Sequence, residues 1–431
     1  MSDILLRGGR VLDPARDIDL QADVLLSDGK VAAIGSDLNT PNKGTDVIDV
    51  KDCWVVPGLI DIHVHLREPG QEYKENIETG TAAAAAGGFT AVCCMPNTNP
   101  VNDTRAVTEL IVARAKAVGA VRVYPIGCIT QGQKGETMSE MGELQEAGCV
   151  ALSDDGHGVA NSEVMRRALE YATSFRLPIV QHCEDKTLSA AGSMHEGLAS
   201  TRFGIRAQPS AAESVMLARD LELVALTGAR YHMAHISCME SLRLIRDAKR
   251  RGLPVTCEVT PHNLMLTDEA CATYDTNFKM NPPLRSVADQ AALREALGDG
   301  TIDAIATDHA PHSLVEKEVE FEQAANGVIG LETAVALAVE LVELGVLTPA
   351  KLVTRMSTGP AGILGLPGGT LALGSPADVT VIDPRMSWTC DPSRFRSKAR
   401  NTPFAGRTMR GRAVLTVVGG RIVFIDEKLA I

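Results

Sequence analysis

The fold is decided by a short stretch at residues 59–65, which reads LIDIHVH. Side chains alternate along a β-strand, so His63 and His65 are expected on one face and Ile62 and Val64 on the other. Two imidazoles at the carboxyl end of one strand can chelate a metal ion. A His-x-His pair also occurs often without a metal, so the rest of the chain has to show whether this pair has partners.

Seven further apolar runs follow this stretch, with helical segments between them. This alternation is typical of βα units that build a parallel sheet, and eight strands is the number that closes a barrel. The eight candidate strands lie at residues 59–65, 90–94, 121–126, 149–153, 178–182, 231–235, 254–258 and 302–307. The candidate helices lie at residues 75–86, 104–117, 161–175, 210–226 and 239–250.

Both ends of the chain read instead as short strands joined by tight turns. Ser27-Asp28-Gly29 separates two apolar runs as a hairpin turn would, and Gly419-Gly420 does the same near the other end. We therefore predict an α/β fold, in which a (β/α)8 TIM-type barrel stands beside a small β-sandwich domain built from both ends. The expected boundaries are residues 1–57 and 367–431 for the β-sandwich domain and residues 58–366 for the catalytic barrel.

The composition is that of an ordinary globular protein with an acidic balance. Hydrophobic residues make up 45% of the 431 residues, the net charge is −12, and only 3% of residues are aromatic. An acidic, aromatic-poor chain is a poor candidate for binding nucleic acid. No apolar run is long enough to span a bilayer, and residues 1–10 carry no signal-peptide core. The ten cysteines contain no Cys-x-x-Cys pair, so we expect reduced thiols in a cytoplasmic protein.

Four more candidate ligands fall at the same end of the predicted barrel as the two histidines. Asp155 follows the fourth strand, His182 and His235 end the fifth and sixth, and Asp308 follows the eighth. Barrel enzymes place their active sites at this end. Imidazole and carboxylate ligands together favour zinc, with manganese, cobalt and iron as alternatives.

The number of these ligands favours two zinc ions per subunit over one. His63 and His65 are expected on one ion and His182 and His235 on the other, with Asp155 between them. The predicted metal set is His63, His65, Asp155, His182, His235 and Asp308.

Longer motifs now point to a family. In chain order they are HVHLREPG at 63–70, MPNT at 95–98, SDDG at 153–156, QHCED at 181–185, AHIS at 234–237, KMNPPLR at 279–285, ATDHAPH at 306–312 and NTPF at 401–404. The set closely resembles the long, bacterial-type (class I) dihydroorotases of the amidohydrolase superfamily. Hydantoinases and the short dihydroorotases bridge their metals with a carbamylated lysine, but no lysine occurs here between Lys134 and Lys186. The resemblance assigns the bridge to Asp155, and its neighbour Asp154 is the rival, with turn formation as its favoured role.

The resemblance implies a zinc-dependent, reversible conversion of (S)-dihydroorotate to N-carbamoyl-L-aspartate, a step of de novo pyrimidine (UMP) biosynthesis. Asp308 is then the catalytic base, which takes a proton from the attacking water and passes it to the departing amide nitrogen. Arg67 is expected to grip the substrate carboxylate. The substrate contacts predicted from the resemblance are His65, Arg67, Asn97, Asn281, His312, Asn326 and Gly327. Many long-type enzymes carry Phe-Gly where this chain has Asn326-Gly327, which predicts a weaker apolar wall beside the ring.

The remaining histidines have plainer interpretations. His232 lies three residues before His235 and is expected to face away from the site as a packing residue. His262 either lines the site or supports its loop, and His309 either orients Asp308 or is structural. His157 and His195 are expected at the surface or in loops. A loop at residues 131–140, assigned to the end of the fourth strand, has the glycines of a mobile lid.

Three other functions compete with this prediction. The nearest is another cyclic amidase, a hydantoinase or allantoinase, and the missing lysine argues against it. A non-catalytic scaffold for aspartate transcarbamoylase would be expected to lose metal ligands, which this chain keeps. A deaminase of the same superfamily is the third. The sequence leaves open whether the chain forms a homodimer or a complex with aspartate transcarbamoylase, and it predicts neither a nucleic-acid nor a membrane partner.

Overall fold

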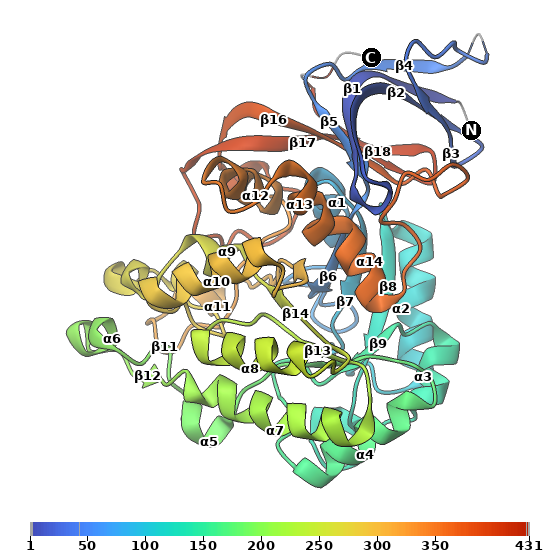
Figure 1. The fold of residues 1–431 in the computed structure, drawn as a ribbon. Helices are drawn as coiled ribbons and strands as arrows, with labels where there is room; N and C mark the ends of the chain where they lie inside the picture. The colour runs from blue at the N-terminus through green and yellow to red at the C-terminus, as the bar shows by residue number, and fades with distance from the viewer. Residues whose placement is uncertain (1–2, 43, 428, 430–431) are drawn as a thin grey trace.

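The computed structural model describes residues 3–42, 44–427 and 429, and its centre is a parallel sheet of eight strands (Figure 1). In spatial order the neighbours run β15-β14-β13-β10-β9-β8-β7-β6. A parallel bridge between Val64 and His309, with the His65 N–H donating to the His309 carbonyl at 2.9 Å, brings the first strand against the end of the last. The predicted (β/α)8 TIM-type barrel is therefore confirmed.

Each of the eight observed strands overlaps a predicted one. They are β6 (Leu59–Val64), β7 (Phe89–Cys94), β8 (Arg122–Gly127), β9 (Ala151–Ser153), β10 (Ile179–Gln181), β13 (Tyr231–Met233), β14 (Val255–Val259) and β15 (Ala304–Ile305). The five predicted helices are also present, as α1 (Ile77–Ala86), α2 (Arg105–Val118), α4 (Ser162–Thr173), α7 (Ala211–Thr227) and α8 (Met239–Arg250).

Further helices lie where the sequence pattern gave no prediction. The longer ones are α3 (Met141–Ala147), α10 (Val287–Asp299) and α12 (Ala334–Glu343). The short ones are α5 (Lys186–Ser189), α6 (Leu198–Phe203), α9 (Pro261–Met265), α11 (Leu314–Lys317), α13 (Pro349–Val353) and α14 (Gly359–Leu364), with a π-helical turn at Thr354–Thr358 and a two-stranded ribbon of β11 (Met194–His195) and β12 (Ala207–Gln208). In the described part of the chain no helix has both the length and the apolar character needed to cross a membrane.

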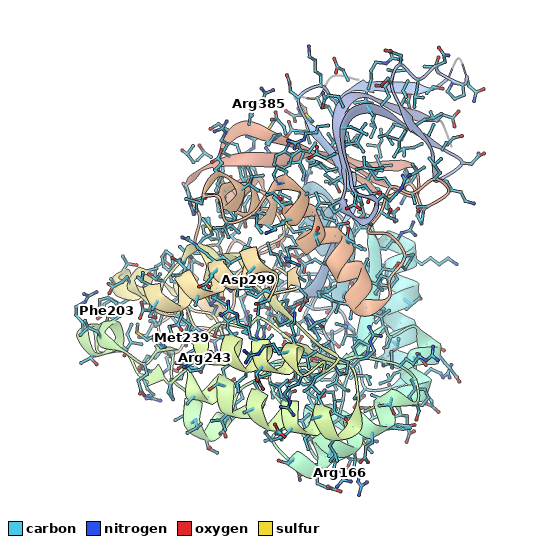
Figure 2. All side chains as sticks on the ribbon, in the orientation of Figure 1. Arg166, Phe203, Met239, Arg243, Asp299 and Arg385 are labelled. Atoms are coloured by element: carbon cyan, nitrogen blue, oxygen red, sulfur yellow. The ribbon has the colours of Figure 1, made fainter. Side chains whose placement is uncertain are left out.

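Figure 2 shows the side chains crowded between the ribbon elements, and an apolar cluster lies inside the barrel. One inner cluster joins Ile60 and Ile62 of β6 to small residues such as Ala91 and Ala304. The strict alternation predicted for β6 is therefore wrong, because Ile62 does not face away from the interior. The register of β6 against β7 shifts between Asp61 and Val64, and this irregularity turns His63 inward as well.

A second eight-stranded sheet lies beside the barrel and contains strands from both ends of the chain (Figure 1). Its strands are β1 (Ile4–Asp13), β2 (Ile18–Ser27), β3 (Lys30–Gly35), β4 (Asp46–Asp49), β5 (Trp54–Pro57), β16 (Val379–Thr389), β17 (Thr408–Val418) and β18 (Arg421–Ile425). β5 pairs with β16 and so joins the two ends, as predicted. Along one edge, the first part of β1 pairs with β4 and the later part pairs with β5, so the sheet branches at β1. The strands of this unit enclose an apolar cluster of their own.

The chain passes from one unit to the other at Gly58, between β5 and β6. Several contacts join the two units, among them an ion pair from Arg122 to Asp378 at 2.8 Å and a hydrogen bond from Thr380 Oγ1 to the Gly88 carbonyl at 2.6 Å. The boundaries at residues 57/58 and 366/367 remain our prediction.

Candidate metal centre and substrate cavity

A cavity of about 230 Å³ opens at the carboxyl ends of the barrel strands. All the predicted site residues except His63 line it, together with Gly156, Lys186 and Ala310. His63 is completely buried. A larger cavity of about 420 Å³ lies against the starts of β13 and β14 and contains none of the predicted residues. The chemistry of the lining, rather than the volume, therefore identifies the candidate site.

The first group that could hold a metal ion is His63, His65 and Asp155. His63 Nε2 lies 3.5 Å from Asp155 Oδ1, and His65 Nε2 lies 3.6 Å from Asp155 Oδ2. All three side chains are buried. The irregular end of β6 brings both imidazoles to the same carboxylate, and their binding of one ion stays a prediction.

The second group is Asp155, His182 and His235, so Asp155 belongs to both. Asp155 Oδ1 lies 3.8 Å from His182 Nδ1 and 3.7 Å from His235 Nε2. His235 follows β13 with a left-handed φ of 33°, which turns its ring toward the Asp155 carboxylate. This sharing of one carboxylate is the arrangement expected for two ions with a bridging ligand.

The residues present fit a bound cation. His63 Nε2 and Asp155 Oδ1 are both buried without a hydrogen-bond partner, and such groups are costly unless something satisfies them. Burial alone would lower the pKa of His63, but the carboxylates of Asp155, Asp308 and Glu258 raise it well above its usual value. Burial alone would raise the pKa of Asp155, but the charge of His63 beside it holds that pKa well below its usual value. The surplus of carboxylate charge around these imidazoles favours a cation.

Glu258 on β14 orients His63, and the sequence analysis missed it. The N–H at His63 Nδ1 donates to Glu258 Oε1 at 2.7 Å, which leaves Nε2 to face Asp155. A carboxylate behind a histidine ligand fixes the tautomer and the direction of the ring. The available signal was the alternation of β14, whose buried polar Glu258 sits between the outward-facing Cys257 and Val259.

His232 lies on the same side as Glu258, so its predicted outward packing role is wrong. Its Nε2 is 3.2 Å from Glu258 Oε2, and its Nδ1 is 2.8 Å from Thr256 Oγ1. The prediction assumed that the strand continues to His235. β13 instead ends at Met233, so the alternation of side chains does not extend to His235 and cannot be used to infer which face His232 occupies.

Glu184 is a second carboxylate that the sequence analysis missed. Its Oε2 lies 3.0 Å from His182 Nε2 and accepts from Asn281 Nδ2 at 2.8 Å and from Lys186 Nζ at 2.6 Å. Because His182 Nε2 points at Glu184, His182 Nδ1 is the atom that faces Asp155. Glu184 thus joins a candidate metal ligand to a candidate substrate contact.

Asp308 lies beside the first group, three residues after the end of β15. Its Oδ1 is 3.0 Å from His65 Nε2 and 3.5 Å from His63 Nε2, and its backbone has a left-handed φ of 47°. Burial alone would raise the pKa of Asp308, but the charges of His63 and His65 lower it below its usual value. The carboxylate is therefore ionised, as a proton acceptor must be. Neither metal-holding group in the described residues includes Asp308, so its role as a ligand stays a prediction.

Arg67 is a cationic side chain of the cavity, which is also lined by Lys186, paired with Glu184. Arg67 is buried, and among the described residues it forms no ion pair with a carboxylate. Its Nε donates to the Pro311 carbonyl at 3.2 Å, and its Nη2 lies 3.4 Å from His312 Nε2. His312 Nε2 donates to the Asn326 carbonyl at 2.8 Å, so this ring holds the loop that carries Asn326 and Gly327. A guanidinium without a protein carboxylate is free to bind an anionic ligand.

The comparisons with known proteins agree with this geometry. A family model described as dihydro-orotase-like matches residues 53–241. A dihydroorotase of Anaeromyxobacter dehalogenans (strain 2CP-C) is 58% identical and covers 99% of both chains. A dihydroorotase of Geobacter metallireducens is 56% identical and covers 98% of this chain and 99% of its own. This chain belongs to the dihydroorotase family.

Solved structures place this dihydroorotase-family chain among the hydantoinase folds. The L-hydantoinase (dihydropyrimidinase) from Arthrobacter aurescens matches with a TM-score of 0.89 at 27% identity, covering 100% of this chain and 98% of its own. The D-hydantoinase (dihydropyrimidinase) from Thermus sp. matches with a TM-score of 0.85 at 26% identity, covering 99% and 96%. Both comparisons support a hydrolase that acts on cyclic amides.

Asp154 has a structural role in this family member. Its Oδ1 accepts from the backbone N–H groups of Ile129 and Thr130 at 2.8 and 3.0 Å. Asp154 therefore holds the loop after β8, while the neighbouring Asp155 faces the histidines. The side chain of Asp154 thus holds a neighbouring loop rather than its own turn, and the bridging role of Asp155 stays a prediction.

The other histidines lie outside the dihydroorotase cavity. His262 is buried in α9, and burial lowers its pKa to about 4, so the ring is neutral. His309 accepts from the Gly330 N–H at 3.2 Å and lies 3.5 Å from Glu75, which supports its structural interpretation. His157 is exposed, whereas His195 is half-buried, 3.4 Å from Arg285 Nη1.

The loop at residues 131–140 follows β8, which is the third barrel strand, so its assignment to the fourth strand is wrong. Its hydrogen bonds include one from the Gln131 N–H to the Thr137 carbonyl at 2.8 Å. None of its residues lines the substrate cavity. Its role as a lid stays a hypothesis.

Proposed function

We propose that the chain is a dihydroorotase, which interconverts (S)-dihydroorotate and N-carbamoyl-L-aspartate in de novo pyrimidine biosynthesis. The observation that carries the proposal is the content of one cavity. It is lined by the buried Arg67, which has no carboxylate partner among the described residues, and by Asp308. Two His/Asp groups that share Asp155 also line it, with His63 of the first group buried behind the lining. The substrate needs these same elements, because it combines a carboxylate with a cyclic amide.

We propose zinc as the metal, with two ions per subunit. His63, His65 and Asp155 would hold one ion, and Asp155, His182 and His235 the other. Bound zinc supplies a Lewis acid that polarises the ring amide carbonyl and lowers the pKa of water beside it. Glu258 and Glu184 hold the rings of His63 and His182 in the orientation this requires.

Asp308 moves the proton. Its carboxylate takes a proton from the attacking water as the new C–O bond forms. It then delivers that proton to the ring nitrogen as the C–N bond breaks, so the carboxylate is regenerated at the end of the cycle. In the biosynthetic direction the same carboxylate accepts the proton of the attacking carbamoyl nitrogen and passes it to the leaving oxygen.

The substrate is held by the neutral and cationic side chains of the cavity. We assign its carboxylate to Arg67. Asn97 accepts the His65 Nδ1–H on its Oδ1 at 2.8 Å, which leaves its amide NH₂ for the substrate. Asn281 is held between Glu184 and Gln208, and His312 supports the turn at Asn326 and Gly327. The ring faces Asn326 rather than a phenylalanine, so we expect its apolar contact to be weak.

The competing functions have less support. The bridging position shared by the two metal groups is occupied by Asp155 rather than by a lysine, which distinguishes the site from that of a hydantoinase or allantoinase. A non-catalytic scaffold would have no use for the metal groups and Asp308. Neither a scaffold nor a deaminase would explain why Arg67 lies in the same site as these groups.

We propose a cytoplasmic location, which the cysteines support. All ten are buried and unpaired, and all lie in the described part of the chain. Burial raises the pKa of thiols such as Cys94 and Cys257 to about 12, so they are unreactive and suited to a reducing compartment. The homodimer and the complex with aspartate transcarbamoylase stay predictions from the family, and analytical ultracentrifugation with and without that partner would test both.

The deciding experiment is hydrolysis of dihydroorotate by the purified protein, with zinc content measured on the same sample. We expect turnover, with hydantoin and allantoin hydrolysed far more slowly. Asp308→Asn should lower kcat by about 10²–10⁴-fold while the protein stays folded, because only the proton carrier is removed. A zinc-loaded protein that prefers hydantoin or allantoin would overturn the proposal.

A further inference from the structure

Lys317, the last residue of α11, is a buried cation outside the mechanism described above. Only 5% of its surface is exposed, and among the described residues it forms no ion pair. Its Nζ donates instead to three main-chain carbonyls, at 2.9 Å to Ala325, 3.1 Å to Gly327 and 3.4 Å to Lys279. Burying an ammonium group without a carboxylate is costly, so this position calls for an explanation.

The three carbonyls belong to two segments that each supply residues to the lining of the substrate cavity. Lys279 begins the KMNPPLR segment that carries Asn281, and Ala325 and Gly327 enclose Asn326. The two segments also touch directly, because the Gly327 N–H donates to the Lys279 carbonyl at 3.0 Å. Lys317 is thus bonded to both segments at their point of contact.

The turn at residues 325–327 is held by side chains at three consecutive carbonyls. Lys317 binds the first and the third, and His312 Nε2 binds the second at 2.8 Å. Asn401 Nδ2 adds a second bond to the third carbonyl at 3.1 Å. Of these groups, only Lys317 also reaches the segment that carries Asn281.

A lysine suits this position because one tetrahedral nitrogen carries three N–H donors. Of the surrounding charges, that of Lys279 opposes the ammonium charge, while those of Asp275 and Glu316 favour it. Burial lowers the pKa of Lys317 to about 7, which shows how little the charge itself is stabilised. The carbonyl bonds, and not an ion pair, hold the side chain in place.

We propose that Lys317 is a positioning residue that fixes the separation between Asn281 and Gly327 and thereby the affinity of the cavity for its substrate. This inference rests on the proposed dihydroorotase function. Lys317 does not touch the reacting atoms. Its loss should therefore weaken binding of dihydroorotate and leave the metal groups and Asp308 undisturbed.

The test compares Lys317→Met with Lys351→Met. Lys351 also donates to a main-chain carbonyl, that of Gly298 at 2.6 Å. It is exposed on α13, however, and it does not line the cavity. We expect Lys317→Met to raise the KM for dihydroorotate about 10- to 100-fold, the effect of losing one or two bonds to a charged donor. kcat and zinc content should change less than about threefold, and Lys351→Met should match the wild type.

A second variant and a second measurement cover the other outcomes. Lys317→Gln keeps two N–H donors on a shorter chain and should give an intermediate KM. Hydrogen–deuterium exchange should be faster in Lys317→Met at residues 279–285 and 325–328 only, and this readout does not depend on which substrate is used.

A folded variant with an unchanged KM and unchanged exchange would refute the inference. So would failure of both variants to fold, because Lys317 would then serve folding rather than the cavity. An inactive wild type that still shows the local change in exchange would count against the proposed function alone.

Discussion

At the scale of single residues, the site depends on carboxylates that stand behind the histidines. His63 and His65 were predictable because a His-x-His pattern is recognisable in the sequence as a candidate pair of metal ligands. Glu258 and Glu184 were not, because their importance arises only when β14 and the segment after β10 bring them to the rings of His63 and His182. The sequence alone does not show which glutamates are buried beside a histidine, and only the folded barrel distinguishes them from surface glutamates.

The role of Glu258 can be tested by Glu258→Gln. The amide oxygen can still accept from His63 Nδ1–H, but the bond loses its charge assistance, so the ring is held less firmly. We expect the affinity for zinc to fall about 10- to 100-fold, measured as the chelator concentration that removes half of the metal. Glu163→Gln, at an exposed glutamate of α4, is the matched control. Equal zinc retention in both variants would exclude an orienting role.

At the scale of elements, the strands were more predictable than the later helices. Each strand is a short apolar run bounded by polar turns, so all eight could be located from the sequence. α12 is buried along most of its length, and its only polar residues are Glu340 and Glu343 near its end, so its sequence shows little helical periodicity. The end of β13 at Met233 could not be predicted either, because no sequence pattern indicates the left-handed backbone conformation at His235.

Glu332, just before α12, should make stability depend on pH. Its carboxylate accepts from the N–H groups of Arg396 and Ser397 at 2.9 and 3.2 Å, and burial nevertheless raises its pKa from 4.5 to about 7. The folded protein therefore holds this proton in a range where the unfolded chain releases it. This contribution to stability is complete below about pH 4.5 and is lost as the pH rises through about 7.

Glu332→Gln removes this titration. Relative to the wild type, the variant should gain about 1–3 kcal/mol in the free energy of unfolding between pH 5 and pH 8. Urea denaturation at the two pH values measures the difference, and Glu343→Gln at an exposed glutamate of α12 is the control. A difference between Glu332→Gln and the wild type that is the same at both pH values would show that Glu332 is ionised throughout.

At the scale of the whole molecule, the β-rich unit and the barrel meet where β17 crosses α12. Gly411 of β17 has a left-handed φ of 86°, and a Cβ there would lie 2.7 Å from the Cβ of Val339. Gly411→Ala should therefore lower the free energy of unfolding by about 2–4 kcal/mol, from backbone strain plus overpacking. Gly374→Ala has a similar φ of 83° with nothing within 4 Å, so it reports the strain alone. Equal losses in the two variants would show that the contact with α12 is loose.

The pairing of β5 with β16 also sets the order in which the molecule can be completed during its synthesis. About 320 residues separate these two strands in the chain, although they are neighbours in the sheet. At the usual pace of translation, β5 leaves the ribosome roughly 15–60 s before its partner does. Throughout that interval one edge of the amino-terminal strands is bare and open to pairing with another chain. The strands before the barrel can therefore complete their sheet only after the barrel has been made, and their bare edge is exposed to pairing with other chains while the barrel is being synthesised.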